Sequence, residues 1–387
     1  MLTKNILFKN FSIKSNNLKT KKLFKNFINE NLPLLDPLKK NYKYSYTKKL
    51  VSRLKKFSNF RIIGMGGSAL GTEAIYNFLK HKIKKKIIFV NNLDVNSLYF
   101  FKKNKNKNLN LIISKSGNTL ETIVNTNILI KKNDKNIILT ENKNNYLRNL
   151  GYQIKAEILE HKNYIGGRYS VLSEVGMLPA ELMGLNEKKF KQFNNLIKNK
   201  KFIYNLIENV STTLAMYKKS KFTSIILNYD ERSEGLFKWY QQLVAESLGK
   251  KSKGILPVTS SMPKDNHSLM QLYLDGNKNN FFTFFSVNEK DSSKINNNLI
   301  LPSHNFLKGK TVYEIAKSQR KATEIVFKKR KIPFRTFEIV NRDEKTLGEL
   351  FCFFILETIL LGKALNVNPF DQPSVELIKY ETKNLLV

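Results

Sequence analysis

The segment 113–122 reads ISKSGNTLET and combines side-chain types that bind phosphate. Its hydroxyls and its one cation belong to Ser114, Lys115, Ser116 and Thr119. An apolar run at 109–113 predicts a buried strand before this loop, and 121–130 predicts a helix after it. The unpaired N–H groups and the positive dipole end at a helix start attract anions. Loops of this composition are also ordinary caps and turns, so the segment alone leaves both interpretations open.

A second turn, GMGGSALG at 64–71, also follows an apolar strand. The dinucleotide pattern G-x-G-x-x-G/A is matched by Gly64, Gly66 and Ala69. That pattern expects an acidic residue at the end of the next strand, but this strand ends at Asn91 and Asp94 comes late. Ser68 instead offers a hydroxyl to a phosphate. Two such turns fit one sugar phosphate held between two helix starts, and glycines that only permit close packing are the alternative.

Further polar residues are candidates for chemistry. They are Gly167 and Arg168 in GGRYS, Glu246 in QQLVAESLGK, His267 in DNHSLMQLYLDG, and Gln372 and Lys379 around the tail segment PSVELI. Each also has a plainer interpretation, as a loop cation, an exposed glutamate, a structural histidine or one lysine among many. No set of His, Cys, Asp or Glu has metal-ligand spacing, so no metal site is predicted.

The elements that must position these residues alternate between strand and helix from about residue 61. Strands are expected at 61–63, 87–91, 109–114, 136–140, 224–228, 281–287 and 334–339. Helices are expected at 68–79, 119–131, 182–219, 235–248, 312–329 and 347–365. This alternation predicts two α/β units in tandem, each with a parallel sheet covered on both faces. Because ligands bind beyond the carboxyl ends of such strands, both turns fall at a suitable place.

The chain has 387 residues, of which 41% are hydrophobic, enough for roughly two or three domains. Its one cysteine, Cys352, can form no disulfide within the chain, and no signal peptide is visible, which predicts a cytoplasmic protein. The apolar stretch 350–361 is shorter than the ~20 residues of a membrane span, and Glu357 interrupts it. We expect a buried helix there and no membrane partner.

The formal net charge is +36, from 67 basic and 31 acidic residues. Such a balance normally indicates a nucleic acid or an anionic membrane as partner. Here the lysines are spread along the chain among many asparagines, and no zinc-finger, zipper or RNA-binding signature occurs. We interpret the charge as general residue usage and predict no nucleic-acid partner. A transit peptide is an alternative for the basic N-terminus, but no arginine precedes Arg53, so we expect a surface segment with some helix.

Taken together and in order, these motifs resemble the phosphoglucose isomerase family. The matching segments are IIGMGGSALG, ISKSGNTLET, GGRYSVLSEVG, QQLVAESLGKKSKGILPV, DNHSLMQLYLDG and NPFDQPSVELIK, which span residues 62–379. The first two occur in sugar-phosphate isomerase-type (SIS) domains in general, whereas the others are more specific to this family. Ile378 departs from the family pattern and can shift the helix that carries Lys379.

The resemblance implies an α/β fold of two tandem SIS domains, which are α/β/α sandwiches with parallel sheets, and a C-terminal helical tail. It divides the chain into a lysine-rich lead-in, a first SIS domain, a second SIS domain, and a final helix with a tail that returns to the active site, at 1–40, 41–200, 201–345 and 346–387. The implied activity interconverts glucose 6-phosphate and fructose 6-phosphate through a cis-enediol, in glycolysis and gluconeogenesis. No cofactor is implied. A homodimer is implied, because in this family the histidine comes from the neighbouring subunit.

Residue roles follow from the same resemblance. Glu246 would move a proton between C1 and C2 of the open-chain sugar, and Arg168 would stabilise negative charge on the enediol. His267 and Lys379 would assist ring opening. The substrate would be bound by Gly67, Ser68, Ser114, Lys115, Ser116, Thr119, Gly167 and Gln372.

Three other functions are compatible with parts of the pattern. An enzyme on the same scaffold with broader specificity would also act on mannose 6-phosphate. A catalytically silent sugar-phosphate sensor would need the phosphate loops but not Glu246, Arg168 and His267. A nucleic-acid binder is favoured by charge alone, and its retention on heparin would depend strongly on salt.

Overall fold

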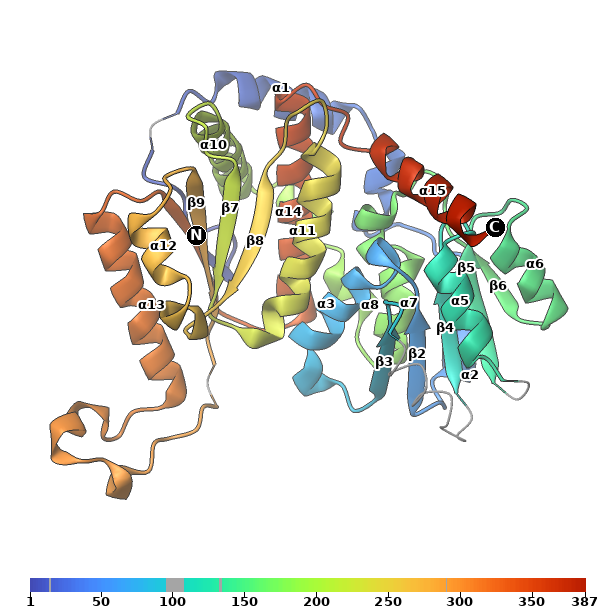
Figure 1. Ribbon diagram of the computed structural model, residues 1–387, viewed down its shortest axis with the longest axis horizontal. Coiled ribbons are helices and arrows are strands. Elements are labelled where there is room, and N and C mark those ends of the chain that lie inside the picture. The colour runs from blue at the N-terminus through green and yellow to red at the C-terminus, as the bar shows by residue number, and fades with distance from the viewer. Residues whose placement is uncertain (14, 95–107, 132–133, 290) are drawn as a thin grey trace.

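The computed structural model describes residues 1–13, 15–94, 108–131, 134–289 and 291–387. It contains two five-stranded sheets that stand side by side (Figure 1). The helices that pack against one another between them are α3 (Leu70–Phe78), α11 (Glu234–Leu248) and α14 (Glu344–Ala364). The predicted fold class, two α/β units with parallel sheets, is confirmed.

The first sheet is parallel throughout, in the order β3-β2-β4-β5-β6. Its strands are β2 (Asn59–Ile63), β3 (Lys86–Val90), β4 (Leu109–Ile113), β5 (Lys135–Thr140) and β6 (Glu157–Glu160). Every residue of β4 is buried, as expected for a central strand covered on both faces. The other helices of this part are α2 (Lys48–Leu54), α5 (Leu120–Leu129), α6 (Tyr146–Gln153), α7 (Glu174–Leu182), α8 (Glu187–Phe190) and α9 (Phe193–Leu196).

The second sheet has the order β1-β10-β9-β7-β8. Its strands are β1 (Ile6–Lys9), β7 (Thr223–Asn228), β8 (Leu256–Ser261), β9 (Asn280–Val287) and β10 (Phe334–Ile339). All neighbours pair in parallel except β1, which lies antiparallel to β10 at the sheet edge. The accompanying helices are α1 (Leu18–Asn29), α10 (Lys200–Tyr217), α12 (Met270–Asp275), α13 (Val312–Lys329) and α15 (Glu376–Leu386). The predicted strands of both units are found within a residue or two, but β1, β6 and β8 were not predicted.

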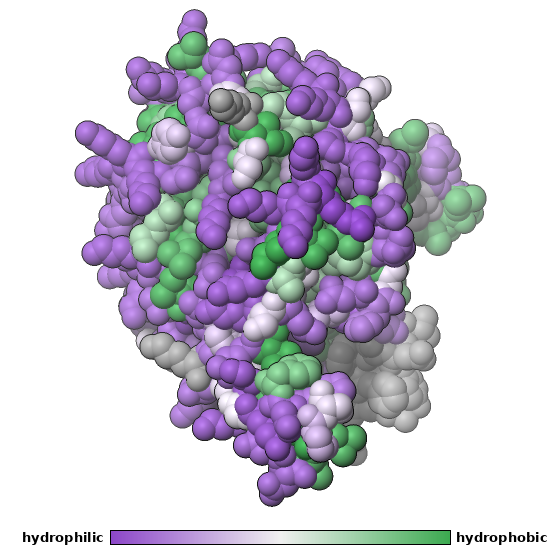
Figure 2. All heavy atoms as spheres, turned by 90° about the vertical axis from the view of Figure 1, so that its left-hand side faces the viewer, coloured by the Kyte–Doolittle hydropathy of each residue, from purple (hydrophilic) through white to green (hydrophobic). Residues whose placement is uncertain are grey.

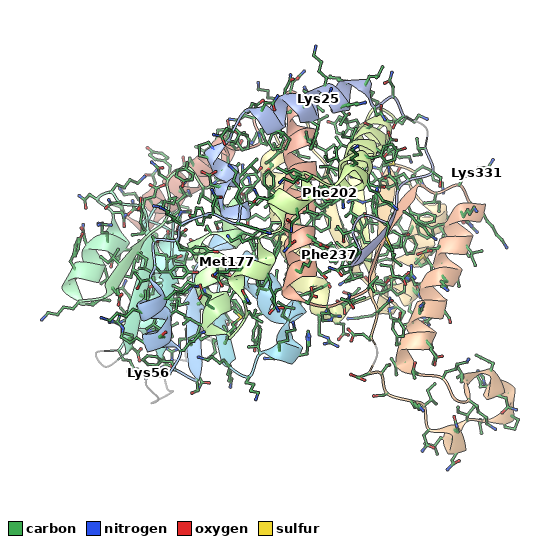
Figure 3. All side chains as sticks on the ribbon, turned by 180° about the vertical axis from the view of Figure 1, so that it is seen from behind. Lys25, Lys56, Met177, Phe202, Phe237 and Lys331 are labelled. Atoms are coloured by element: carbon green, nitrogen blue, oxygen red, sulfur yellow. The ribbon has the colours of Figure 1, made fainter. Side chains whose placement is uncertain are left out.

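Helix α14 is the buried helix expected at 350–361. Its Glu357 forms an ion pair with Arg335 of β10, and both side chains are 2% exposed, which explains a carboxylate in an apolar stretch. Figure 3 shows Phe202 and Phe237 inside the same core; they come from α10 and α11, which both pack against α14. Among the helices that the structure describes, none is long and apolar enough to cross a membrane.

The N-terminal segment belongs to the second sheet and its core, which the sequence did not predict. Ile6 and Phe8 of β1 are buried, and the neighbouring Leu7 and Lys9 are less so. Phe27 of α1 is also buried in the main core. Abundant lysines obscure this short alternation in the sequence. The domain boundaries at residues 40, 200 and 345 stay a prediction.

The surface is hydrophilic over most of the face shown in Figure 2, with small apolar areas between the polar side chains.

Candidate active site

Two glycine-containing turns meet at the carboxyl edge of the first sheet. One is η2 (Gly66–Ser68), a 3-10 turn after β2, and the other is η4 (Gly167–Leu172), which follows β6. A Cβ atom on Gly67 would lie 2.2 Å from the carbonyl carbon of Gly167 and 2.6 Å from the backbone nitrogen of Arg168. Only glycine permits this approach, so Gly67 brings the first predicted phosphate turn against Arg168.

The second predicted phosphate loop follows β4, the neighbour of β2 in the sheet. The hydroxyls of Ser114 and Thr119 are hydrogen-bonded at 2.9 Å, and the N–H of Gly117 donates to Ser114 Oγ at 3.2 Å. Gly117 has a φ of +67°, and a Cβ atom there would lie 1.9 Å from Asn145 Oδ1. The hydroxyl-bearing Ser116 is exposed. Both predicted phosphate loops therefore lie at one edge of the sheet, at adjacent strands.

Lys115 is partly buried in this loop, and its Nζ lies 3.6 Å from a carboxylate oxygen of Glu141. Burial lowers the pKa of Lys115, and the Glu141 carboxylate opposes this shift. The positive charges of Lys143 and Arg168 lower that pKa further. Because Arg168 influences Lys115, the two predicted cations belong to one electrostatic site.

Arg168 is buried, and each of the five N–H groups of its guanidinium has an acceptor. The acceptors are Ser247 Oγ at 2.9 Å, Glu246 Oε2 at 3.1 Å, Gln372 Oε1 at 2.6 Å, and the carbonyls of Pro369 and Asp371 at 2.7 and 3.0 Å. These groups come from α11 and from the tail after α14. One side chain thus joins η4, α11 and the tail.

Glu246 lies in the last turn of α11, and its side chain is 30% exposed. One carboxylate oxygen accepts from Arg168, and the other accepts from Gln242 Nε2 at 2.9 Å. A Cβ atom on Gly66 would lie 2.8 Å from the same Gln242 nitrogen. The sequence analysis missed Gln242, although it precedes Glu246 by one helical turn and therefore lies on the same face of the helix.

The tail crosses the site before α15 begins. The Gln372 side chain and two tail carbonyls accept from Arg168, and Lys250 forms an ion pair with Asp371 at 2.9 Å. The tail therefore contacts Arg168 as far as Gln372. Lys379 lies beyond it on α15, where it is exposed and pairs with Glu376 at 2.6 Å. Among the described contacts, none joins Lys379 to Arg168 or Glu246.

His267 is exposed in η6 (Lys264–His267), which follows the carboxyl end of β8. Glu246 lies at the opposite end of that strand, because α11 connects β7 to β8 and ends before β8 begins. Gln241 of α11 accordingly donates to the carbonyl of Pro257, near the start of β8, at 3.1 Å. A strand of six residues is about 20 Å long, so this chain does not bring His267 to its own Glu246.

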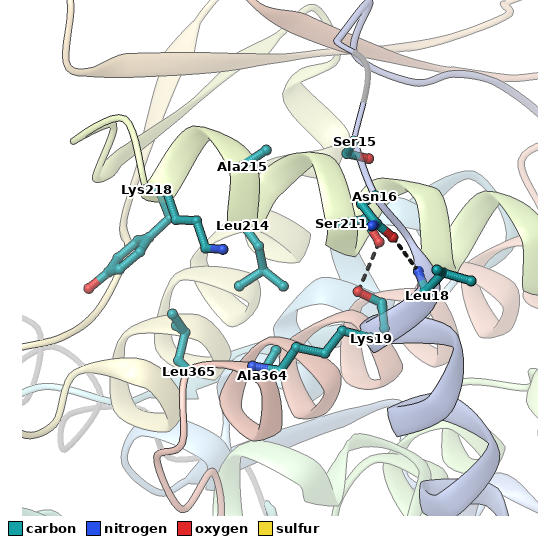
Figure 4. A pocket seen from close by; sticks show the side chains of 12 residues that line it. Ser15, Asn16, Leu18, Lys19, Ser211, Leu214, Ala215, Lys218, Ala364 and Leu365 are labelled. Carbon is teal, nitrogen blue, oxygen red and sulfur yellow. Dashed lines mark hydrogen bonds between the residues drawn. The ribbon is translucent and has the colours of Figure 1, made fainter.

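A cavity of about 490 Å³ lies elsewhere, between α1, α10 and the end of α14 (Figure 4). It is lined by a hydroxyl pair, Thr20 and Ser211, by apolar side chains such as Leu214, and by Lys19 and Lys218. Its lining contains no carboxylate or imidazole, so it offers no base for proton transfer. Within the described residues, no group of three or more His, Cys, Asp or Glu side chains could hold a metal ion.

Comparison with known proteins agrees with the motifs over nearly the whole chain. Residues 45–386 match the family described as phosphoglucose isomerase. The glucose-6-phosphate isomerase of Methanocaldococcus jannaschii is 34% identical over 340 residues, which cover 84% of this chain and 83% of that protein. The glucose-6-phosphate isomerase of Mycoplasmopsis pulmonis is 32% identical over 353 residues, which cover 82% of this chain and 80% of that protein.

Solved structures share the fold. A hypothetical protein from Thermus thermophilus has a TM-score of 0.84 at 22% identity, with 95% of each chain covered. A glucose-6-phosphate isomerase from Chlamydia trachomatis has a TM-score of 0.73 at 19% identity, with 87% of this chain and 71% of that chain covered. The sequence match and the shared architecture lead to one conclusion: this chain belongs to the phosphoglucose isomerase family.

Proposed function

We propose that Glu246 and Arg168 carry out the central chemistry of an aldose–ketose isomerase. The chain interconverts glucose 6-phosphate and fructose 6-phosphate, the activity that its family and its named relatives support. The observation that carries the residue roles is the contact of Arg168 with Glu246 at 3.1 Å. At this contact, the carboxylate of Glu246 and the fixed cation of Arg168 lie next to the loops after β2 and β4, whose residues suit a phosphate.

Glu246 is the base in this proposal. It removes the proton from C2 of open-chain glucose 6-phosphate, and the C2–H electron pair forms the C1–C2 double bond of the enediolate. The C1 carbonyl pair moves to O1, which takes the proton of the C2 hydroxyl, so that the negative charge passes to O2. The O2 electron pair then forms the C2 carbonyl while the C1–C2 double-bond pair takes the proton from Glu246 at C1, which gives fructose 6-phosphate. One carboxylate serves both carbons because they are adjacent and the enediolate is planar. The partial exposure of Glu246 leaves it accessible to substrate, and Gln242 orients its second oxygen.

Arg168 stabilises the negative charge that develops on the oxygens of C1 and C2. Its buried hydrogen bonds keep the guanidinium in one position. Gln372, which shares the Nη1 group with Glu246, stands beside the reacting end of the sugar. Gly67 and Gly167 give the substrate close access to the backbone.

The phosphate group is held by the two loops at the edge of the first sheet. Its ligands are Ser68, Ser114, Lys115, Ser116 and Thr119, supported by the start of α5. Binding energy from this remote group fixes the position of C1 and C2 against Glu246.

Ring opening is assigned to His267 and Lys379, with His267 supplied by a second copy of the chain. The separation of His267 from Glu246 along β8 supports this arrangement. A second support is the arm at 291–311, which projects from the body at the lower left of Figure 1. The arm exposes Leu299, Leu301 and Phe306, each by 70% or more, so it suits an interface between copies. The proposal includes a cytoplasmic location, because Cys352 is a free thiol and thiols stay reduced in the cytoplasm.

A coupled assay with fructose 6-phosphate tests the function directly. We expect Glu246→Gln to lower kcat by at least roughly 100-fold, because the amide cannot accept a proton, while KM changes by only a few fold. Glu234→Gln, at the exposed start of the same helix, is the matched control and should keep wild-type kcat. Wild-type turnover in Glu246→Gln would contradict the assignment of the base. Mannose 6-phosphate assayed in parallel measures the breadth of specificity.

A further inference from the structure

A closed chain of buried hydrogen bonds connects Arg168 to the tail through the residue that follows Glu246. Arg168 Nε donates to Ser247 Oγ at 2.9 Å, and this hydroxyl lies 2.8 Å from the Tyr169 hydroxyl. The Tyr169 hydroxyl donates to the carbonyl of Pro369 at 2.9 Å, and Arg168 Nη2 donates to the same carbonyl at 2.7 Å. Ser247 and Tyr169 are 0% and 1% exposed, so water does not compete for these bonds.

The chemistry of the groups fixes the direction of every bond in this ring. A carbonyl only accepts, so Tyr169 gives its single hydroxyl proton to Pro369. Arg168 Nε only donates, so Ser247 accepts there and gives its own proton to Tyr169. The ring therefore has one arrangement of protons, in which both hydroxyls donate and accept.

We propose that Ser247 and Tyr169 are positioning residues that hold the Arg168 guanidinium in the plane in which Nη1 faces Glu246. This inference rests on the proposed function, because it concerns the cation that stabilises the enediolate. Ser247 adjoins Glu246 on α11, so a single turn of helix carries both the base and the group that orients the cation. Without the Nε bond four Nη hydrogen bonds remain, three of them to Gln372 and the tail carbonyls, so the guanidinium tilts toward the tail and Nη1 shifts from the reacting end.

The backbone of η4 is held separately from the side chain of Arg168. Trp239 of α11 donates from Nε1 to the carbonyl of Arg168 at 3.2 Å, and the close packing of Gly67 against Gly167 fixes the same turn. Loss of the Ser247 hydroxyl therefore leaves the backbone in place and changes the orientation of the guanidinium. The expected effect is on the transition state rather than on the fold.

The test compares Ser247→Ala and Tyr169→Phe with a matched control, Ser211→Ala. Ser211 is also buried and hydrogen-bonded, but it lies on α10 beside Thr20, outside the active site. We expect Ser247→Ala to lower kcat roughly 10-fold with KM for fructose 6-phosphate changed less than about 2-fold, because a hydrogen bond to a charged group is lost. Tyr169→Phe removes the acceptor of the Ser247 proton and should lower kcat in the same direction by a smaller factor. The control should keep wild-type kcat. Wild-type kcat in both site variants, or an equal loss in the control, would overturn the proposal.

A double-mutant cycle separates positioning from general structural support. Arg168→Lys lacks the Nε donor, so Ser247→Ala should lower kcat little further in that background. A further loss of roughly 10-fold there would mean that Ser247 acts independently of Arg168 and would refute the inference. If circular dichroism shows that Ser247→Ala does not fold, the same double-mutant cycle is measured with Tyr169→Phe, which removes only one oxygen atom.

Ligand affinity keeps this test independent of turnover. 5-Phosphoarabinonate carries a carboxylate where the enediolate would be charged, whereas sorbitol 6-phosphate is uncharged there. Measured by calorimetry, Ser247→Ala should raise the dissociation constant of 5-phosphoarabinonate roughly 10-fold, because Arg168 no longer faces its carboxylate. The dissociation constant of sorbitol 6-phosphate should stay unchanged. Equal effects on the two ligands would refute the positioning role. Absence of wild-type turnover would contradict the proposed function instead.

Discussion

At the scale of single residues, the motifs identify side chains that the fold brings into direct contact. Arg168 and Glu246 are 78 positions apart and meet at 3.1 Å. Gln242 and Ser247 were not predicted, although both lie within one turn of Glu246. Spacing along a helix was a usable signal for Gln242, but no local pattern indicates that the Ser247 hydroxyl faces Arg168, because that contact depends on how α11 packs against η4.

The lowered pKa of Lys115 gives a prediction for substrate affinity. In the proposed site the ammonium form of Lys115 binds the phosphate, and this form predominates below the Lys115 pKa, which burial lowers from 10.5. The sugar phosphate is already doubly charged above about pH 7. We therefore expect KM for fructose 6-phosphate to rise as pH increases through the lowered pKa, at a lower pH than an ordinary lysine would give.

Lys115→Arg is the matched variant, because its guanidinium stays charged between about pH 7 and 10. Initial rates between about pH 7 and 10 should show a flatter KM profile for Lys115→Arg than for the wild type. Lys115→Gln should have a high KM throughout. Identical profiles for the wild type and Lys115→Arg would show that another group governs the rise.

At the scale of elements, alternating strands and helices were predicted well where apolar runs are long. The strand β4 and the helices α11, α13 and α14 were found close to the expected bounds. The unpredicted strands β1, β6 and β8 are short or rich in polar residues, so their pattern does not stand out. Pairing of β1 with β10 is a contact across the whole chain, which local propensity cannot reveal.

The contact between η2 and η4 predicts that Gly67 tolerates no side chain. Gly67→Ala would place a Cβ atom 2.2 Å from backbone of Gly167, so one turn must move. We expect a loss of about 1–3 kcal/mol in the free energy of unfolding and a lower kcat, because Arg168 follows Gly167 directly.

Gly167→Ala is the steric control, since a Cβ atom there would meet only the Cα of Gly67, at 3.9 Å. Thermal unfolding of both variants beside the wild type measures the difference. Equal melting temperatures for Gly67→Ala and Gly167→Ala would show that the two turns are not in close contact in solution.

At the scale of the whole molecule, the residues of the candidate site come from both sheets and their helices. The first sheet carries both loops that we propose for the phosphate, while α11 of the second unit carries Glu246, which meets Arg168 of η4. His267 lies at the far end of β8, and the arm at 291–311 projects away from the body (Figure 1). These placements are consistent with an assembly in which two copies complete each other's sites.

Hybrid dimers test this assembly. Glu246→Gln and His267→Ala homodimers should each be nearly inactive, but a random mixture should recover about a quarter of wild-type activity, because half of such dimers are hybrids and each hybrid has one site with both residues intact. Native mass spectrometry verifies subunit exchange, and exchange without recovered activity would argue against a histidine supplied by the partner.

The sequence by itself determined the residue types, the order of the motifs, the α/β alternation and the family. These follow from short-range patterns, such as apolar periodicity and glycine-rich turns after strands. Only the tertiary structure decided that Arg168 meets Glu246 and Gln372, the latter 204 positions away, that the N-terminal strand joins the second sheet, and that His267 lies apart from Glu246. Such contacts depend on how whole elements pack, and no local pattern of residues carries that information.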